Sequence, residues 1–73
     1  MRENNIRQIR ERLELSQIDF SEAIGVSQAS VSNYECNKQE VSPEVARRVI
    51  SAARKRGVEL TFDDVYANAA AEE

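Results

Sequence analysis

The sequence predicts an all-α fold, a compact domain of four to five short helices. Three stretches with helical patterning are each preceded by a residue that favours a helix start, namely Ser16, Ser27 and Ser42. Residues suited to a helix end, Gly25 and Gly57, follow two of these stretches. Because 73 residues leave room for one small core, we expect a single domain over residues 1–66 and a frayed acidic tail over 67–73.

The first helix is expected over residues 3–13. Ile6, Ile9 and Leu13 repeat at the i, i+3, i+7 spacing of one helix stripe. Arg10 falls within this stripe, so its guanidinium needs a carboxylate partner from another part of the fold, because an unpaired buried charge is costly.

Two short helices should follow, at residues 17–24 and 28–35. Ser16 can cap the first of them and Ser27 the second. After the second helix, Asn37 is the expected stop, since asparagine tolerates positive φ better than most residues.

Small and apolar residues between 17 and 35 predict a steep crossing of these two helices. A turn of three or four residues needs one residue with positive φ, which Gly25 supplies, and a close backbone approach needs a small side chain, which Ser21 supplies. The apolar residues then fall on the inner side of the bend: Phe20, Ile24, Val26, Val31 and Tyr34.

A fourth helix is expected from Pro43 to about Arg56, because Ser42, Pro43 and Glu44 combine a cap, a first-turn proline and an acid near the positive helix end. Gly57 should end it. Its inner face is expected to consist of Val45, Ala46, Val49, Ile50 and Ala53. Its outer side carries five cations, which we interpret as a solvated face rather than a DNA-binding patch: Arg47, Arg48, Arg54, Lys55 and Arg56.

After Gly57 two patterns compete. Alternating apolar residues resemble a short strand, whereas Thr61 with Asp64 has the spacing of a capping box that opens a helix. We favour an extended link followed by a short helix. Five apolar residues of this region either form a dimer surface or close the base of the core: Val58, Leu60, Phe62, Val65 and Tyr66.

Composition excludes several function classes. The chain has no His and a single Cys, Cys36, so imidazole catalysis, His-containing and multi-Cys metal sites and an internal disulfide are excluded. Neither a nucleophile–base pair nor a Gly-rich phosphate loop is present, so we expect no enzyme, cofactor or metal. The first residues lack the apolar core of a signal peptide and no apolar run has membrane-spanning length, so we expect a cytoplasmic protein without a membrane partner.

The charge distribution allows contact with phosphates although the formal net charge is −3. Residues 1–58 hold all the Lys and Arg and have a net charge of +2, whereas residues 59–73 hold five acids and no base. A mildly basic body can therefore meet a polyanion while the acidic end faces away from it.

The stretch from Ser16 to Glu35 resembles the helix-turn-helix of phage repressor and Cro-like proteins, the lambda-repressor-like or XRE type. The residues that fit this pattern are Gln17, Ser21, Gly25, Val26, Ser27, Gln28, Val31 and Glu35. The sequence departs from relatives in three places: Glu14 stands where a Gly is frequent, Ser21 where Ala is usual, and Cys36-Asn37 where a Gly is common. The resemblance also implies that Arg10 pairs with Glu35 at the end of the recognition helix.

A neutral face on the 28–35 helix fits the reading of base edges, because amides offer a donor and an acceptor together and can engage adenine bidentately. The expected base-reading residues are Gln28, Ala29, Ser32 and Asn33. The docking geometry of the motif implies that phosphates are met by the start of the preceding helix and by nearby loop residues. The expected phosphate-positioning residues are Ser16, Gln17, Ser27, Ser30, Asn37 and Lys38.

The sequence thus predicts a regulator that binds double-stranded DNA by sequence, of phage or prophage type, and represses by occluding a promoter. Because one recognition helix reads only about four or five base pairs, we expect a homodimer on a pseudo-palindromic operator and no small-molecule effector. The alternative is a protein-interaction module, such as an antitoxin or accessory factor, which would use the same helical bundle to hold a protein partner. DNA binding that weakens as salt rises distinguishes the two.

Overall fold

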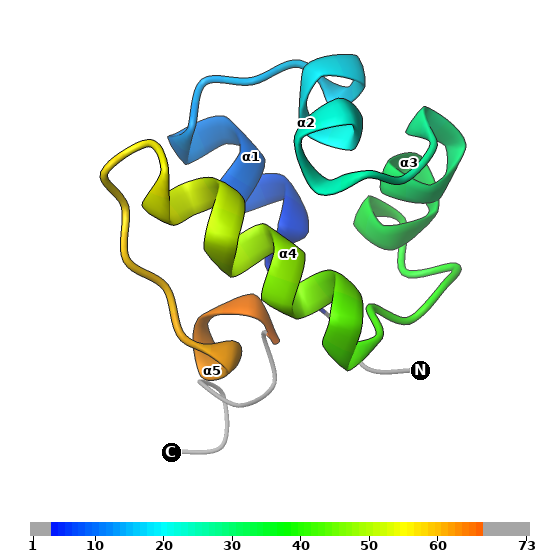
Figure 1. Cartoon of the computed structure of the whole chain (residues 1–73). Helices are drawn as coiled ribbons and strands as arrows, with labels where there is room; N and C mark the ends of the chain where they lie inside the picture. The colour runs from blue at the N-terminus through cyan, green and yellow to red at the C-terminus, as the bar shows by residue number, and fades with distance from the viewer. Residues whose placement is uncertain (1–3, 67–73) are drawn as a thin grey trace.

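The computed structural model describes residues 4–66, which form five α-helices and no β-strand (Figure 1). The all-α prediction is confirmed. The helices are α1 (Ile6–Arg12), α2 (Gln17–Ile24), α3 (Gln28–Glu35), α4 (Pro43–Arg54) and α5 (Phe62–Val65). The tail at 67–73 lies outside the described residues.

Side chains cap the starts of α2, α3, α4 and α5. Ser16, Ser27 and Ser42 have extended backbones, and each hydroxyl oxygen accepts a hydrogen bond from the backbone N–H three residues later. At α5, Thr61 and Asp64 form a complete capping box. The link after α4 is therefore followed by a helix and not by a strand.

Four helices end through a residue in the left-handed region, followed by a hydrogen bond that reaches back five residues. The residues with positive φ are Glu14 (61°), Gly25 (74°), Asn37 (60°) and Gly57 (83°). Their following amides donate at 3.2, 3.0, 2.8 and 2.9 Å, in the bonds Leu15–Arg10, Val26–Ser21, Lys38–Asn33 and Val58–Ala53. Asn37 therefore adopts the left-handed conformation that glycine adopts at positions 25 and 57.

Two helix boundaries differ from those expected. The first helix begins at Ile6 rather than at residue 3, because the N–H of Asn5 donates to the carbonyl of Val65 and the chain leaves the helical path there. The fourth helix ends at Arg54 rather than Arg56, because the last amides bond three residues back in a tightened turn.

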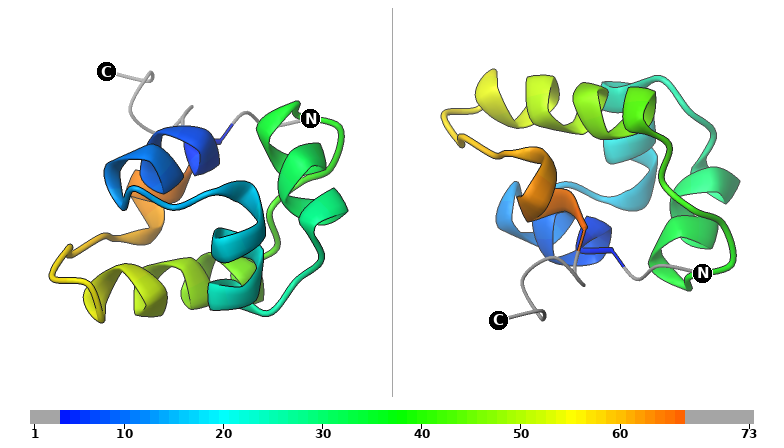
Figure 2. Two further views of the ribbon diagram at one scale, coloured as in Figure 1. Left: turned by 90° about the horizontal axis from the view of Figure 1, so that it is seen from above. Right: turned by 90° about the horizontal axis from the view of Figure 1, so that it is seen from below.

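The core lies between α1, α2, α3 and α4, with α5 closing one side. Its buried apolar residues are Ile6, Ile9, Phe20, Ile24, Val31, Tyr34, Val41, Ala46, Val49, Ala52, Ala53, Leu60 and Val65. On α4 the buried stripe includes Ala52, which the sequence analysis left out, whereas Val45 and Ile50 are only partly buried. Both views of Figure 2 show α5 between α1 and α4, and α3 apart from it at the edge of the molecule.

The proposed dimer surface after Gly57 needs correction. Leu60 is 9% exposed and Val65 is fully buried, because α5 packs on α4 and on the start of α1, so neither side chain is available to a partner. Val58 and Tyr66 are half-buried, and the Tyr66 hydroxyl donates to the Val41 carbonyl at 2.8 Å. Phe62 alone of the five remains largely exposed, at 43%.

Candidate nucleic-acid interface

The pair α2 and α3 crosses through the turn at Gly25. The φ of Gly25 is +74°, so the backbone favours glycine, whereas a Cβ would come within 2.9 Å only of Arg48 Nη1, the end of a flexible side chain that can move aside. Ser21 is buried where the two helices approach, and its hydroxyl donates to the Ile18 carbonyl at 2.6 Å. This internal bond satisfies the polar atom that replaces the alanine frequent in relatives.

The third helix turns an uncharged ridge away from the core. Val31 and Tyr34 are buried, whereas Gln28 and Ala29 are exposed and Ser32 and Asn33 are half-exposed. These four are the residues predicted to read bases. The structure therefore brings them together on one edge of the molecule (Figure 1).

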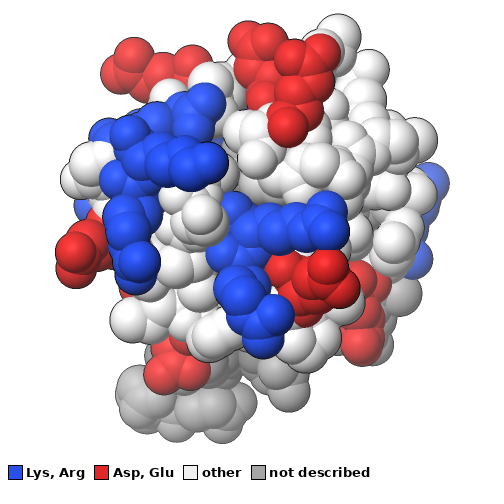
Figure 3. Space-filling model, in the orientation of Figure 1, with Lys and Arg blue, Asp and Glu red and all other residues white. Residues whose placement is uncertain are grey.

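The distribution of charged side chains also distinguishes the surface of α3 from that of α4. In Figure 3 the Lys and Arg side chains gather over α4, while the surface over α3 at the right of the view is mainly uncharged. The single charged residue of α3 is Glu35, and its side chain is only 1% exposed. The ridge therefore offers hydrogen-bonding groups without a fixed charge.

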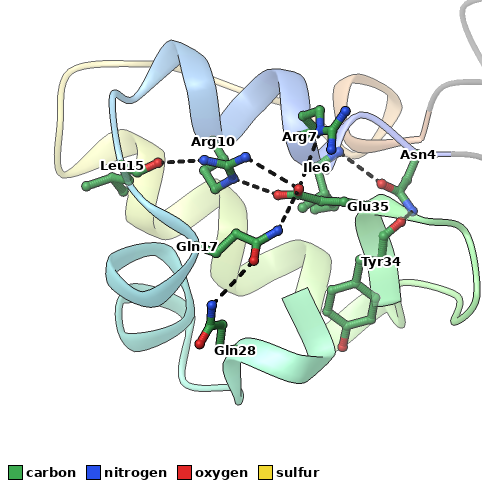
Figure 4. Close-up of polar contacts among 9 residues, drawn as sticks. All are labelled: Asn4, Ile6, Arg7, Arg10, Leu15, Gln17, Gln28, Tyr34 and Glu35. Atoms are coloured by element: carbon green, nitrogen blue, oxygen red, sulfur yellow. Dashed lines mark hydrogen bonds and ion pairs between the residues drawn. The ribbon is translucent and has the colours of Figure 1, made fainter. Parts of the chain in front are cut away.

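Behind the ridge, Glu35 holds three elements together (Figure 4). Arg10 Nε lies 2.6 Å from Glu35 Oε2, and Arg10 Nη2 lies 3.4 Å from Oε1. Arg10 Nη1 also donates to the Leu15 carbonyl at 2.9 Å, after the end of α1. This ion pair between α1 and α3 supplies the carboxylate partner that Arg10 needs, since its own side chain is 16% exposed.

A chain of side-chain amides connects this ion pair to the ridge. Gln17 Nε2 donates to Glu35 Oε1 at 3.1 Å, and Gln28 Nε2 donates to Gln17 Oε1 at 3.5 Å. The side chain of Gln17, predicted to contact a phosphate, is thus engaged inside the protein. Its backbone N–H, with that of Ile18, has no hydrogen-bond partner among residues 4–66.

The other predicted phosphate contacts lie at or near helix ends. Ser16 caps α2 and Ser27 caps α3, and Ser27 also donates to the Ser30 hydroxyl at 3.0 Å. Asn37 and Lys38 are exposed directly after α3.

Ionisation of the ion pair follows from its contacts. The hydrogen bond to Glu35 raises the pKa of Arg10. Burial by itself would raise the pKa of Glu35, but hydrogen bonds from Arg10, Gln17 and Arg7 outweigh burial and leave this pKa below its usual value. Burial raises the pKa of the Tyr34 hydroxyl.

Four contacts of the site, made by three residues, were not predicted from the sequence. Arg48 Nη1 donates to the carbonyls of Ile24 and Gly25 at 3.3 and 3.4 Å, and so covers the end of α2. Asn4 Nδ2 donates to the Tyr34 carbonyl at 3.0 Å. Arg7 Nε lies 3.5 Å from Glu35 Oε1. A helical pattern gives no signal for such contacts, since each joins residues more than 20 positions apart.

Residues 4–66 contain neither a candidate metal centre nor a membrane-spanning helix. Residues 4–66 contain no group of three or more His, Cys, Asp or Glu side chains placed to hold a metal ion. None of their helices combines the length and apolarity needed to cross a bilayer. Cys36 is a free, exposed thiol after the end of α3.

A family model described as helix-turn-helix matches residues 6–60, which include all of α1 to α4. A comparison with curated proteins gave no match. The family match covers the caps at Ser16, Ser27 and Ser42, the turn at Gly25 and the Arg10–Glu35 ion pair described above. The chain therefore belongs to the helix-turn-helix family of XRE type, whose members are DNA-binding transcription regulators.

Proposed function

We propose that this protein is a Cro/repressor-type regulator that reads operator half-sites in the major groove with residues 28–35 and represses by occluding a promoter. The observation that carries the proposal is the uncharged, outward ridge of α3. A helix of this width fits the major groove, where each base pair presents its own pattern of donors and acceptors.

The chemistry of the ridge supports base reading. Gln28 and Asn33 each carry a donor and an acceptor and can engage adenine bidentately, and each such contact is worth about 1–3 kcal/mol of discrimination. Ser32 can donate or accept, and the methyl group of Ala29 can contact a thymine methyl.

Contacts with the DNA backbone would fix the ridge at both ends. The unpaired N–H groups of Gln17 and Ile18 at the start of α2 offer a site for one phosphate, beside the Ser16 hydroxyl. Asn37 and Lys38 are exposed at the opposite end of α3 and offer a second site. Such contacts set the register of the protein on the duplex without reading sequence.

We further propose that a second copy of the chain binds at α5. Phe62 is exposed beside a hollow of about 340 Å³, which it lines together with Glu40, Val41, Pro43 and Tyr66. An exposed apolar ring next to a hollow on the same surface can pair with its own copy through a two-fold axis. Two recognition helices would then reach half-sites one helical turn apart.

The experiment begins with selection of bound sequences from random duplexes, which gives the operator and its half-site spacing together. Fluorescence anisotropy then compares Kd for the selected and scrambled duplexes. We expect Gln28→Ala to weaken binding to the selected duplex by about 5- to 150-fold and to leave scrambled DNA nearly unaffected. Gln8→Ala is the matched control, because Gln8 is exposed on α1 beside Leu60, on the side of α5. Equal losses on both duplexes for Gln28→Ala contradict the reading role.

Substitution of a residue that contacts the DNA backbone should have a different effect. We expect Lys38→Ala to weaken both duplexes equally and to reduce the slope of log Kd against log salt by about 0.9. If the wild-type protein binds no duplex in a salt-dependent manner, the regulator assignment is wrong and a protein partner becomes the better reading.

Dimer formation has its own test. Phe62→Ser should lower the cooperative binding of two half-sites while leaving the binding of one isolated half-site unchanged, because Phe62 is 43% exposed and belongs to α5, which lies apart from α3 (Figure 2). Unchanged cooperativity would show that another surface joins the two copies.

A further inference from the structure

Arg7 lies at the edge of the interface, and its positive charge is not needed to neutralise Glu35. Its side chain is 62% exposed, and its Nε lies 3.5 Å from Glu35 Oε1. The same carboxylate is already compensated by Arg10, whose Nε lies at the shorter distance of 2.6 Å. The group of two arginines and one glutamate therefore keeps a net charge of +1.

The end of the Arg7 guanidinium is open to a further ligand. Within residues 4–66 its Nη1 and Nη2 groups have no acceptor, since the contact with Glu35 uses Nε. A planar guanidinium with both terminal nitrogens available matches two oxygens of a phosphate in a bidentate arrangement.

Arg7 lies close to the start of α2, where a phosphate is proposed to bind. Glu35 Oε1 accepts from Gln17 Nε2 at 3.1 Å, so Arg7 and the first residue of α2 share one carboxylate oxygen as neighbours. Figure 4 shows Arg7 and Gln17 on opposite sides of this oxygen. The unpaired N–H groups of Gln17 and Ile18 belong to the same region.

We propose that Arg7 binds a backbone phosphate of the operator duplex, adjacent to the phosphate at the start of α2. The inference rests on the proposed DNA-reading function and adds a positioning residue to it. Arg7 contributes affinity and register and no base preference, because every nucleotide presents the same phosphate. Its exposed contact with Glu35 contributes little to folding, as is usual for surface ion pairs.

Arg12 provides a matched control on the same helix. It is also exposed, and it lines a hollow with Asn5, Gln8, Leu60 and Asp64, on the side of α1 that meets α5. Arg7→Ala and Arg12→Ala therefore remove the same charge from the same helix on different faces. Arg7→Lys keeps the charge and removes the planar fork.

The test measures Kd for the selected duplex over a series of salt concentrations, after circular dichroism has compared the folding of the variants. We expect Arg7→Ala to reduce the slope of log Kd against log salt by about 0.9 and Arg12→Ala to leave it unchanged. Arg7→Lys should keep the slope while binding more weakly than wild type. Partial unfolding would lower the active fraction at every salt concentration without changing the slope, so the slope remains informative.

A neutral methylphosphonate placed at each backbone position in turn locates the contact. Wild type should lose affinity at one position beside the α2 phosphate, and Arg7→Ala should be insensitive there. An unchanged slope for Arg7→Ala, or equal reductions for Arg7→Ala and Arg12→Ala, overturns the role of Arg7. Failure of wild type to bind DNA at all overturns the proposed function instead, so the two failures are distinguishable.

Discussion

Removal of the Arg10 side chain tests whether the ion pair with Glu35 holds α1 to α3. Arg10→Ala deletes the contacts at 2.6 and 3.4 Å to the carboxylate and the bond of 2.9 Å to the Leu15 carbonyl. Glu35, whose side chain is 1% exposed beside Arg10, would keep Gln17 at 3.1 Å and the exposed Arg7 at 3.5 Å as its remaining partners.

The magnitude follows from this geometry. Breaking a buried ion pair by removing one partner costs about 3–5 kcal/mol, because an uncompensated charge is left inside the protein. Two remaining partners of Glu35 place the expected loss at the lower end, about 3 kcal/mol. Domains of this kind have total stabilities of about 5–15 kcal/mol, so the variant should stay folded at 25 °C with a Tm lowered by about 12 °C or more.

Urea denaturation followed by circular dichroism measures the loss. Arg47→Ala is the control, because Arg47 is exposed on α4 and its side chain makes no ion pair or hydrogen bond with other described residues. Its effect should stay within about 0.5 kcal/mol. If Arg10→Ala also loses less than about 1 kcal/mol, the pair behaves as a surface contact and the reasoning fails.

Four further substitutions test the charge and backbone features of the fold, one of them also in an Arg48→Ala background. The lowered pKa of Glu35 means that its ionised form stabilises the protein above the ordinary glutamate pKa of about 4.3, and that this stability is lost as pH falls through the lower pKa of the folded state. Glu35→Gln should therefore flatten the free energy of unfolding between about pH 5 and pH 3 in urea melts, and parallel curves for the two proteins contradict this. Glu14→Gly should raise the free energy of unfolding by about 0.5–1 kcal/mol, because φ at this position is 61°. Asn37→Gly should change the free energy of unfolding less. A destabilised Glu14→Gly protein would show that the contacts of the Glu14 side chain outweigh the backbone strain. Gly25→Ala should lower the free energy of unfolding by about 1–2 kcal/mol. The same loss should occur in an Arg48→Ala background if backbone strain causes it, rather than the 2.9 Å distance between the new Cβ and Arg48 Nη1.

Much of the fold could be predicted because its helix signals are local. The bounds of α2 and α3 follow from the caps Ser16 and Ser27 and from the left-handed residues Gly25 and Asn37, all within one or two positions of the helix ends. A charged residue in an apolar stripe likewise demanded a buried partner, which is how the pairing of Arg10 with an acid could be expected.

Features that depend on distant contacts could not be predicted. The start of α1 is set by the bond from Asn5 to Val65, 60 residues along the chain. Apolar residues near the C-terminal end cannot reveal whether they face their own core or another molecule, and packing against α4 buries Leu60 and Val65. The functions of the ridge residues remain predictions, since their exposure permits contact with DNA and does not demonstrate it.

The short last helix has a consequence for the order in which the molecule opens. Four residues are far too few for an isolated helix, so Phe62–Val65 is held by its capping box, by its packing and by the two bonds from Asn5 to Asp64 and Val65, at 2.9 and 2.8 Å. Breaking those bonds separates the start of α1 from α5. Backbone amides there should exchange with solvent deuterium through local opening, sooner than those of α2, and each opening would briefly uncover the side chains of Leu60 and Val65.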